Sequence, residues 1–276
     1  LAESLINLSH CNPFTSERVD AEKAILGSRC VEREATWSWD HDSPGGRQNI
    51  VLLQERALSL ISGMRDKIGA CPTLTEEDRV LYQETVLYAL YHRYYPYIRE
   101  MLDTSLETGE PATSTPFYAD LSDEARHYYH VGPHTFESFS RLPHLFALGF
   151  QIKRAFHFIH SSFVGRSQAM SQLRASVWQS IVTHDTRRYS LGLYEQMASF
   201  GTLICGPSGT GKELVARAIA YSRYIPFDPK RQCFEEDYRR SFYPLSLSAL
   251  ANSVIESELF GHMRGSYTGA NADRIG

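Results

Sequence analysis

The sequence predicts a mainly α-helical N-terminal region followed by an incomplete α/β domain with a parallel sheet. Apolar residues recur at helical spacing through much of residues 1–160. Residues 202–219 then read as a strand, a glycine-rich turn and a helix, and residues 241–247 read as a second buried strand. A chain of 276 residues is long enough for two domains. We therefore expect a helical region over residues 1–160 and a second domain over residues 163–276.

Several helices are expected within the first region. Apolar spacing predicts one over residues 49–70. Thr75, followed by three acidic residues, is a good start for the next, and Pro96 is expected to break or kink that helix. Further helices are expected from Ser122 and over residues 143–160.

Tyrosines gather in the expected helix after Thr75, and they allow two interpretations. Tyrosines at helical spacing are more often a core and its rim than the lining of a ligand pocket. We favour the core, with the pocket as the alternative. The residues are Tyr88, Tyr91, Tyr94, Tyr95 and Tyr97.

The composition indicates an ordinary globular protein, with 42% hydrophobic residues and a net charge of −4. No basic block is present, which argues against nucleic-acid binding through phosphates. Five cysteines without a CxxC pair favour a reduced, cytoplasmic setting. No apolar run is long enough to span a bilayer. The histidine pairs at 127/130 and 157/160 have helical spacing but no further ligands at a convincing offset, so solvated or capping roles are favoured over a metal site.

The glycine-rich turn carries the strongest chemical signal. It follows the apolar run 202–205, in which Cys205 is expected to be buried, and it precedes the helical pattern 214–219. Its glycines allow successive N–H groups to point at an anion, and the helix start adds a positive dipole end. Lys212 supplies a mobile charge for the outer phosphates. Glu213 stands where the general pattern has a hydroxyl for magnesium, and a carboxylate also ligates hard cations. We expect a nucleotide site at Gly206, Pro207, Ser208, Gly209, Thr210, Gly211, Lys212 and Glu213.

A second constellation lies near the end of the chain. Gly265 and Gly269 bracket an aromatic residue, Tyr267, and a threonine. A loop that displays Tyr267 to a partner is chemically sensible, since exposed aromatic residues anchor interfaces. From composition alone, a simple surface turn is the more common explanation.

Together these motifs resemble the AAA+ domain of sigma-54-dependent transcriptional activators, the bacterial enhancer-binding proteins. The phosphate loop ending in Lys-Glu is followed by ESELFGH at 256–262 and by GSYTGA at 265–270, which is similar to the family's GAFTGA. Phe163-Val164-Gly165-Arg166-Ser167 also resembles the opening of that domain. The resemblance covers about residues 163–276 and says nothing about residues 1–162.

The resemblance implies a function for each motif. Val164 and Gly165 would lie near the adenine of ATP, and residues 206–213 would hold its phosphates and Mg²⁺. The loop that touches sigma-54 would comprise Gly265, Ser266, Tyr267, Thr268, Gly269 and Ala270. In such proteins ATP hydrolysis in a ring, usually a hexamer, remodels promoter complexes of sigma-54 RNA polymerase. Residues 1–160 would then be an input or regulatory region.

The sequence also departs from the family pattern. Tyr267 keeps the aromatic ring of the family's Phe, whereas Ser246 replaces the Asn that relays nucleotide state. The spacing indicates an insertion around residues 184–199 and an extra loop near residues 228–240.

The chain stops at Gly276, before any strand with a Walker B acidic pair, an arginine finger or a DNA-binding helix-turn-helix. We therefore expect a truncated fragment that is inactive as an ATPase, with DNA contacts only through a missing C-terminal domain. Two alternatives stay open. One is another P-loop ATPase whose GSYTGA is a surface turn. The other is a non-catalytic nucleotide-binding or interaction remnant.

Overall fold

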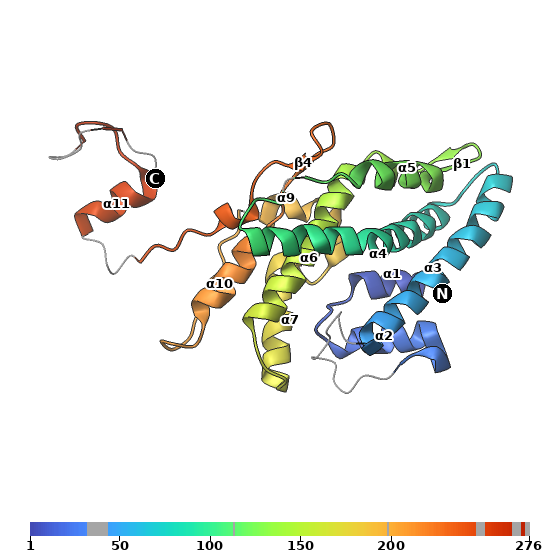
Figure 1. Cartoon of the computed structure of the whole chain (residues 1–276), viewed down its shortest axis with the longest axis horizontal. Helices are drawn as coiled ribbons and strands as arrows, with labels where there is room; N and C mark the ends of the chain where they lie inside the picture. The colour runs from blue at the N-terminus through green and yellow to red at the C-terminus, as the bar shows by residue number, and fades with distance from the viewer. Residues whose placement is uncertain (32–43, 113, 198, 247–251, 267–271, 274–276) are drawn as a thin grey trace. The chain divides into compact units, whose positions relative to one another are not determined.

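A computed structural model describes residues 1–276 except 32–43, 113, 198, 247–251, 267–271 and 274–276 (Figure 1). Most of the described residues are helical. The α-helices are α1 (Ala2–His10), α2 (Ser16–Leu26), α3 (Pro44–Ala70), α4 (Glu76–Thr108), α5 (Tyr118–Tyr129), α6 (Leu142–Ser162), α7 (Gln168–Val182), α8 (Thr186–Arg188), α9 (Tyr194–Met197), α10 (Lys212–Tyr221) and α11 (Asn252–Phe260). Shorter helical turns are η1 (Gly27–Arg29), η3 (Glu137–Phe139), η4 (Tyr189–Leu193) and η5 (Tyr238–Ser241).

The described strands form two antiparallel pairs. The strand β1 (His130–Val131) pairs with β2 (His134–Thr135), and β3 (Phe227–Asp228) pairs with β4 (Cys233–Phe234). The mainly helical prediction is therefore confirmed, whereas a parallel sheet is not seen among the described residues.

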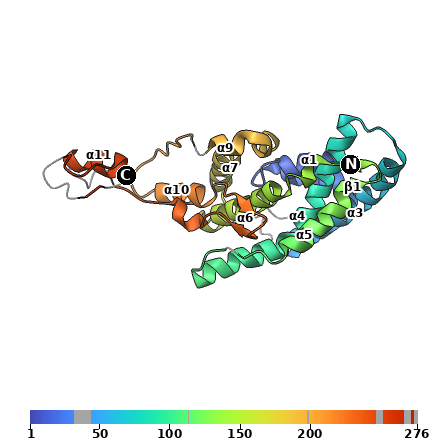
Figure 2. The same ribbon diagram turned by 90° about the horizontal axis from the view of Figure 1, so that it is seen from above.

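The chain divides into two compact units, Leu1–Ser241 and Phe242–Gly276. In the first unit α4 packs against α1, α3, α5 and α6 (Figures 1 and 2). The first unit thus includes both the helical region and the glycine-rich turn with its helix α10.

The long helix α4 begins as its sequence predicts. The Thr75 hydroxyl accepts a hydrogen bond from the backbone N–H of Asp78 at 3.1 Å, which satisfies one of the free donors of the first turn. The helix ends at Gly109, whose φ of 73° is the left-handed conformation that glycine adopts without strain. The expected break at Pro96 does not occur, because α4 continues through this residue to Thr108. Packing of buried residues on both sides of Pro96, such as Tyr94 and Ile98, holds the helix together there.

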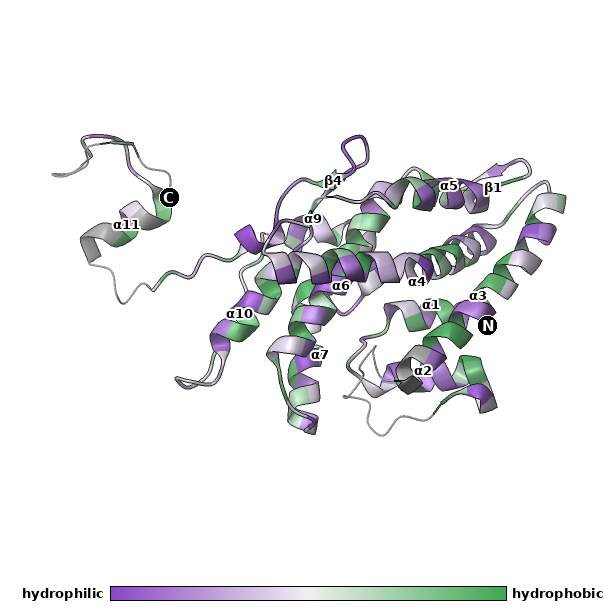
Figure 3. Cartoon of the chain, viewed as in Figure 1, coloured by the Kyte–Doolittle hydropathy of each residue, from purple (hydrophilic) through white to green (hydrophobic). Residues whose placement is uncertain are grey.

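Helix α6 forms the centre of the first unit. Figure 3 shows that α6 carries hydrophobic residues over much of its length, and most of its side chains are buried. The β3–β4 hairpin covers one end of it, where Phe227 packs on Phe146 and Phe234 packs on Phe150, at ring-centroid distances of 4.7 and 4.5 Å. The extra loop expected near residues 228–240 thus contributes aromatic side chains to the core.

The loop between α1 and α2 docks onto α7. The Asn12 side chain donates to the carbonyl of Ala175 at 3.0 Å, and the Ser171 hydroxyl donates to the carbonyl of Phe14 at 2.9 Å. The Phe14 ring stacks on Phe156 of α6 at 5.3 Å. Residues from the start of the chain therefore belong to the same core as α6 and α7.

The two strands expected around the glycine-rich turn are not seen among the described residues, and residue 247, the last of the second, lies outside them. Residues 202–205 form neither helix nor strand, Leu203 is 88% exposed, and Cys205 is exposed rather than buried. Residues 242–246 likewise form no strand, and residues 243–246 are exposed. Parallel strands depend on hydrogen-bonded neighbours and on helices that cover both faces. Among the described residues neither segment has a paired strand, so apolar composition alone does not produce one.

The predicted insertion around residues 184–199 contains α8, η4 and α9. In the part of the chain that the structure describes, no helix is both long and apolar enough to cross a membrane.

Candidate nucleotide-binding site

The glycine-rich turn leads directly into α10. Gly209 and Gly211 have φ values of 79° and 86°, which L-residues with a side chain rarely adopt. Gly211 is the N-cap of α10, and its carbonyl accepts hydrogen bonds from Leu214 and Val215 at 3.0 and 3.3 Å. The turn and the first helical turn are thus joined as a phosphate-binding loop requires.

The curl of the loop is compact. The Thr210 hydroxyl donates to the carbonyl of Pro207 at 2.9 Å. A methyl group added at Gly206 would lie 3.1 Å from the same hydroxyl oxygen, so a larger residue would open the curl. The loop thus combines a tight backbone with a helix N-terminus, and both suit an anion with several oxygens.

Lys212 closes the loop on itself. Its ammonium donates to the carbonyls of Gly206 at 2.9 Å and Pro207 at 2.6 Å. These are exposed hydrogen bonds to neutral acceptors, which a phosphate group can replace with stronger, charge-assisted ones. The lysine is therefore already positioned across the mouth of the loop.

Glu213, the expected Mg²⁺ ligand, faces solvent at the start of α10. Its carboxylate forms an ion pair with Arg217 one turn later, at 2.7 Å. An exposed pair of this kind contributes little stability, so it is readily exchanged for another cation. Among the described residues no group of three or more His, Cys, Asp or Glu side chains gathers as a metal site.

Helix α10 is fixed by a buried arginine that sequence reasoning missed. Arg154 of α6 is fully buried and donates to the carbonyls of Tyr221 at 2.6 Å and Arg223 at 2.8 Å. These carbonyls lie at the C-terminal end of α10, where a cation also meets the negative end of the helix dipole. Burial lowers the pKa of Arg154. The guanidinium nevertheless stays charged, since it donates to two carbonyls and lies over two aromatic rings. A charged residue between the apolar residues of α6 was the available signal.

Val164 and Gly165, expected near the adenine, lie just before α7 and are exposed. The guanidinium of Arg174 in α7 donates to the carbonyl of Phe163 and, at 2.9 Å, to that of Gly165. Helix α10 packs against both α6 and α7. The described hydrogen bonds therefore join Gly165 to the helix beside α10, rather than to the glycine-rich loop itself.

The second constellation lies in the unit Phe242–Gly276. Gly265 has a φ of 86°, and the Ser266 hydroxyl donates to the carbonyl of Met263. The Arg264 N–H donates to the carboxylate of Asp273 at 2.7 Å. The remaining residues of the hexapeptide, 267–270, lie outside the described residues. Ser246 is described and exposed.

Helix α11, which spans Asn252–Phe260, lies before this hexapeptide. It is followed by Gly261 with a φ of 72° and by His262, whose ring nitrogen lies 2.6 Å from the Ser257 hydroxyl. The ESELFGH motif therefore covers the second half of a helix and its C-terminal turn.

Comparison with known proteins identifies the second part of the chain. Residues 185–276 match the sequence model of the "Sigma-54 interaction domain". The chain is therefore similar to that family over this segment, which is a third of its length. The expected resemblance to sigma-54-dependent activators is thereby confirmed.

Several curated regulators are similar to this chain. The Nif-specific regulatory protein of Herbaspirillum seropedicae is 34% identical over 113 residues, which are 41% of this chain and 16% of that protein. The C4-dicarboxylate transport transcriptional regulatory protein DctD of Pseudomonas aeruginosa is 35% identical over 122 residues, 44% of this chain and 20% of the regulator. The DNA-binding transcriptional regulator NtrC of Klebsiella pneumoniae is 43% identical over 79 residues, 29% of this chain and 14% of NtrC.

The chain thus spans about a fifth or less of the length of these relatives. No solved structure matches the chain.

Proposed function

We propose that this chain is part of a bacterial, cytoplasmic transcription regulator that binds ATP with Mg²⁺ and acts on sigma-54 RNA polymerase. The observation that carries the proposal is the combination of a sigma-54 interaction domain match over residues 185–276 with the loop geometry around Lys212. In this function Gly206 through Glu213 hold the phosphates and Mg²⁺. Val164 and Gly165 contact the adenine, and Gly265 through Ala270 contact sigma-54.

The chemistry of the loop supports the nucleotide part. Backbone N–H groups at the start of α10 and the Lys212 ammonium supply donors and positive charge to a polyphosphate. The bound metal would neutralise charge on the phosphates, with the Glu213 carboxylate as the protein ligand available in the loop. Ser246 would relay the nucleotide state, with a hydroxyl in place of the family's amide.

The proposal extends to the whole regulator. ATP hydrolysis in a hexameric ring moves the sigma-54-contacting loop and remodels the promoter complex. DNA is contacted through a separate C-terminal helix-turn-helix domain. Residues 1–160 act as the input region that regulates this activity, and residues 163–276 form the first part of the AAA+ domain.

A retention experiment tests the sigma-54 contact. The protein that contains residues 1–276 is incubated with sigma-54 and with ADP plus aluminium fluoride, a mimic of the hydrolysis transition state. We expect retention of sigma-54 by the unaltered protein and loss of retention with Tyr267→Ala. Tyr267→Phe is the matched control, since it keeps the ring and removes only the hydroxyl.

The outcome separates this proposal from an ordinary P-loop ATPase. Nucleotide binding is expected to be the same in both Tyr267 variants, because this residue lies outside the phosphate loop. Equal retention of sigma-54 by Tyr267→Ala and the unaltered protein would contradict the role of the loop.

A further inference from the structure

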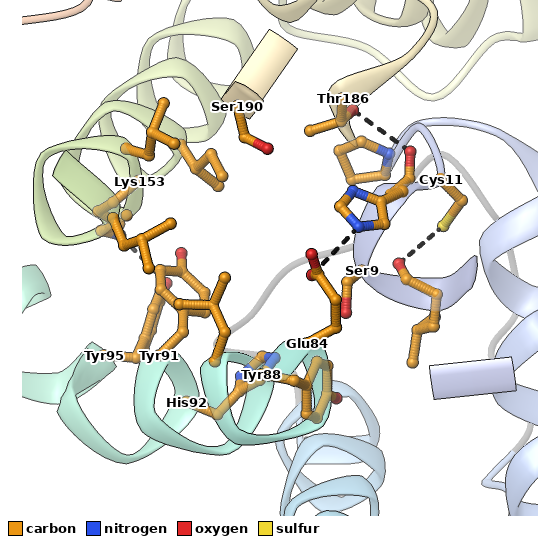
Figure 4. Close-up of a pocket in the computed structure, with 18 of the residues that line it drawn as sticks. Ser9, Cys11, Glu84, Tyr88, Tyr91, His92, Tyr95, Lys153, Thr186 and Ser190 are labelled. Carbon is orange, nitrogen blue, oxygen red and sulfur yellow. Dashed lines mark hydrogen bonds and ion pairs between the residues drawn. The ribbon is translucent and has the colours of Figure 1, made fainter. Parts of the chain in front are cut away.

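A cavity of about 190 Å³ lies within the unit Leu1–Ser241, outside the nucleotide loop. Its walls come from the end of α1, one face of α4, one face of α6, Trp178 of α7 and the α8–η4 turn (Figure 4). Most of these residues precede the part of the chain that matches the sigma-54 interaction domain. Nothing in the proposed nucleotide or sigma-54 chemistry uses this cavity.

The tyrosines of α4 divide between this cavity and the surrounding protein. Tyr88, Tyr91 and Tyr95 line the cavity, one helical turn apart. Tyr94, in contrast, points to another side, where its hydroxyl donates to the Glu124 carboxylate at 3.1 Å. Tyr97 stacks on Phe117 at 5.4 Å. Tyr88 and Tyr94 are buried in the core, as favoured from the sequence, and Tyr88, Tyr91 and Tyr95 also line the cavity.

The cavity has an apolar body with charged groups at its edges. Leu145, Ile152, Phe156 and Trp178 contribute apolar surface. In Figure 4 Glu84 lies on one side, and its carboxylate pairs with His10 at a nitrogen–oxygen distance of 3.4 Å. Lys153 lies on the opposite side beside Tyr91 and Tyr95. A ligand that fits this arrangement has an apolar body and a polar end.

The charges on the walls favour a negatively charged ligand. Lys153 is only 7% exposed, and its ammonium lies 3.2 Å from the Tyr95 hydroxyl. Arg141 adds a further cation to the lining, whereas Arg18 is ion-paired with Glu22 at 3.0 Å. Glu84, the one carboxylate of the lining, is paired with His10. In a poorly solvated cavity such an excess of positive charge stabilises an anion.

The buried polar atoms of the lining that have no hydrogen-bond partner among the described residues include the Tyr88 hydroxyl and Nδ1 of His92. The Tyr88 side chain is 6% exposed, so water does not reach it freely from outside. Buried polar groups in folded proteins are nearly always hydrogen-bonded, to protein, water or ligand. These two atoms therefore point to an occupant with polar groups.

The size of the cavity limits the occupant to a single ring. A dry cavity of about 150 Å³ accommodates benzene, so 190 Å³ accommodates one ring with a small substituent. The rings of Tyr91, Phe156 and Trp178 offer aromatic surface to such a ligand.

We propose that this cavity binds a small aromatic carboxylate, with its ring against the apolar walls and its carboxylate at Lys153. The site is independent of the nucleotide loop, because none of the loop residues lines the cavity. The polar atoms of Tyr88 and His92 hydrogen-bond the ligand directly or through a water molecule.

Calorimetric titration and thermal shift with the 276-residue chain test this proposal. The probes are benzoate, 4-hydroxybenzoate and phenylacetate. Benzyl alcohol, which has a ring without charge, and acetate, which has charge without a ring, are the controls. We expect at least one of the three acids to bind with a Kd below about 1 mM, and both controls to bind about tenfold more weakly or not at all.

Two variants connect the binding to this cavity. Lys153→Met removes the charge and is expected to weaken binding of the acid about tenfold while leaving benzyl alcohol unaffected. Leu87→Trp fills the cavity from α4 and is expected to abolish binding of the acid. Lys230→Met, on the exposed β3–β4 turn, is the matched control for the lysine.

Three outcomes would overturn the proposal. The first is no binding of any of the three acids at about 10 mM. The second is binding of benzyl alcohol as tight as that of the acids, which assigns the cavity to neutral ligands. The third is unchanged binding in Lys153→Met, which remains decisive if Leu87→Trp fails to fold.

Discussion

The guanidinium of Arg154 donates a hydrogen bond to the carbonyl of Tyr221, the last residue of α10, across 2.6 Å. Arg154 is fully buried in α6, and its ring contacts with Phe150 and Tyr238 hold it in place. One end of α10 is therefore fixed to the core, while its other end carries the glycine-rich loop.

Replacing Arg154 by Met is expected to destabilise the first unit by about 3 kcal/mol. The substitution removes the buried donor of two carbonyls, those of Tyr221 and Arg223. Urea unfolding followed by circular dichroism measures the change. Arg126→Met, an exposed arginine in a helix, is the control and is expected to change stability by less than about 0.5 kcal/mol. Equal effects of the two substitutions would contradict the role of Arg154.

Replacing Lys212 by Ala is expected to weaken ATP binding at least about a hundredfold, because the cation that faces the outer phosphates is lost. Fluorescence titration with a labelled ATP analogue measures the affinity. Folding is expected to be unchanged, since the two hydrogen bonds of Lys212 lie at the exposed surface. Lys230→Ala serves as a control, and retained micromolar affinity in Lys212→Ala would count against the site.

Replacing Gly209 by Val is expected to reduce nucleotide affinity by about tenfold or more. A methyl group at this position meets no atom within 4 Å, so the cost arises from the backbone φ of 79°. A β-branched residue avoids this conformation and redirects the N–H groups of the loop. Gly63→Ala, in the middle of α3, is the control, and its nucleotide affinity is expected to equal that of the unaltered chain.

Replacing Arg174 by Met is expected to weaken nucleotide binding several-fold, since Gly165 loses the donor that holds its carbonyl at 2.9 Å. GTP and ATP are compared in the same titration. We expect the preference between the two bases to fall, because Gly165 is proposed to lie near the base rather than the phosphates. A uniform loss for both nucleotides, with the preference intact, would place Gly165 elsewhere.

The stability of the chain is expected to fall in acid partly through His92. Burial, together with the charge of Arg18, lowers the pKa of this imidazole to about 3. The His92 side chain is half-buried, because it lines two cavities. Protein atoms nevertheless pack around its ring on all sides. An unfolded histidine has a pKa near about 6.5, so between pH 6.5 and 3 the unfolded state binds a proton that the folded state lacks.

The free energy of unfolding therefore decreases as pH falls below about 6.5, by at most about 1.4 kcal/mol per pH unit from this group. His92→Gln is expected to flatten the dependence between about pH 6.5 and 5, and His127→Gln, at an exposed site, is expected to leave it unchanged. Unfolding curves across that range measure both. An unchanged slope in His92→Gln would show that the imidazole is solvated.

Local signals predicted the helices well, since caps and apolar spacing act within a few residues. Thr75 starts α4, and α6 lies where its pattern places it. The predictions of strands at 202–205 and 242–246 were wrong, because strand formation is not decided within a few residues. A strand depends on distant partners, and apolar residues in a short run do not specify them.

The glycine-rich loop of the candidate site could be predicted from the sequence. The two arginines that bond backbone carbonyls near it could not. Spacing alone identified Gly206 through Lys212, because the motif is contiguous. Arg154 and Arg174 act through backbone carbonyls 67 and 9 residues away in the sequence, and such pairings leave no local pattern. The tyrosines of α4 had a pattern, but periodicity gives the face of a helix without saying whether protein or a cavity lies opposite.

The aromatic hairpin β3–β4 joins the helical region and α10 into one cooperatively folding part of the chain. Phe227 and Phe234 come from beyond α10 and are buried against Phe146 and Phe150 of α6. A protease cut in the exposed turn around Lys230 would therefore loosen α6, α10 and the arginine between them in one cooperative transition. The glycine-rich loop at the start of α10 is thus connected to α6 through packed side chains as well as through the chain itself.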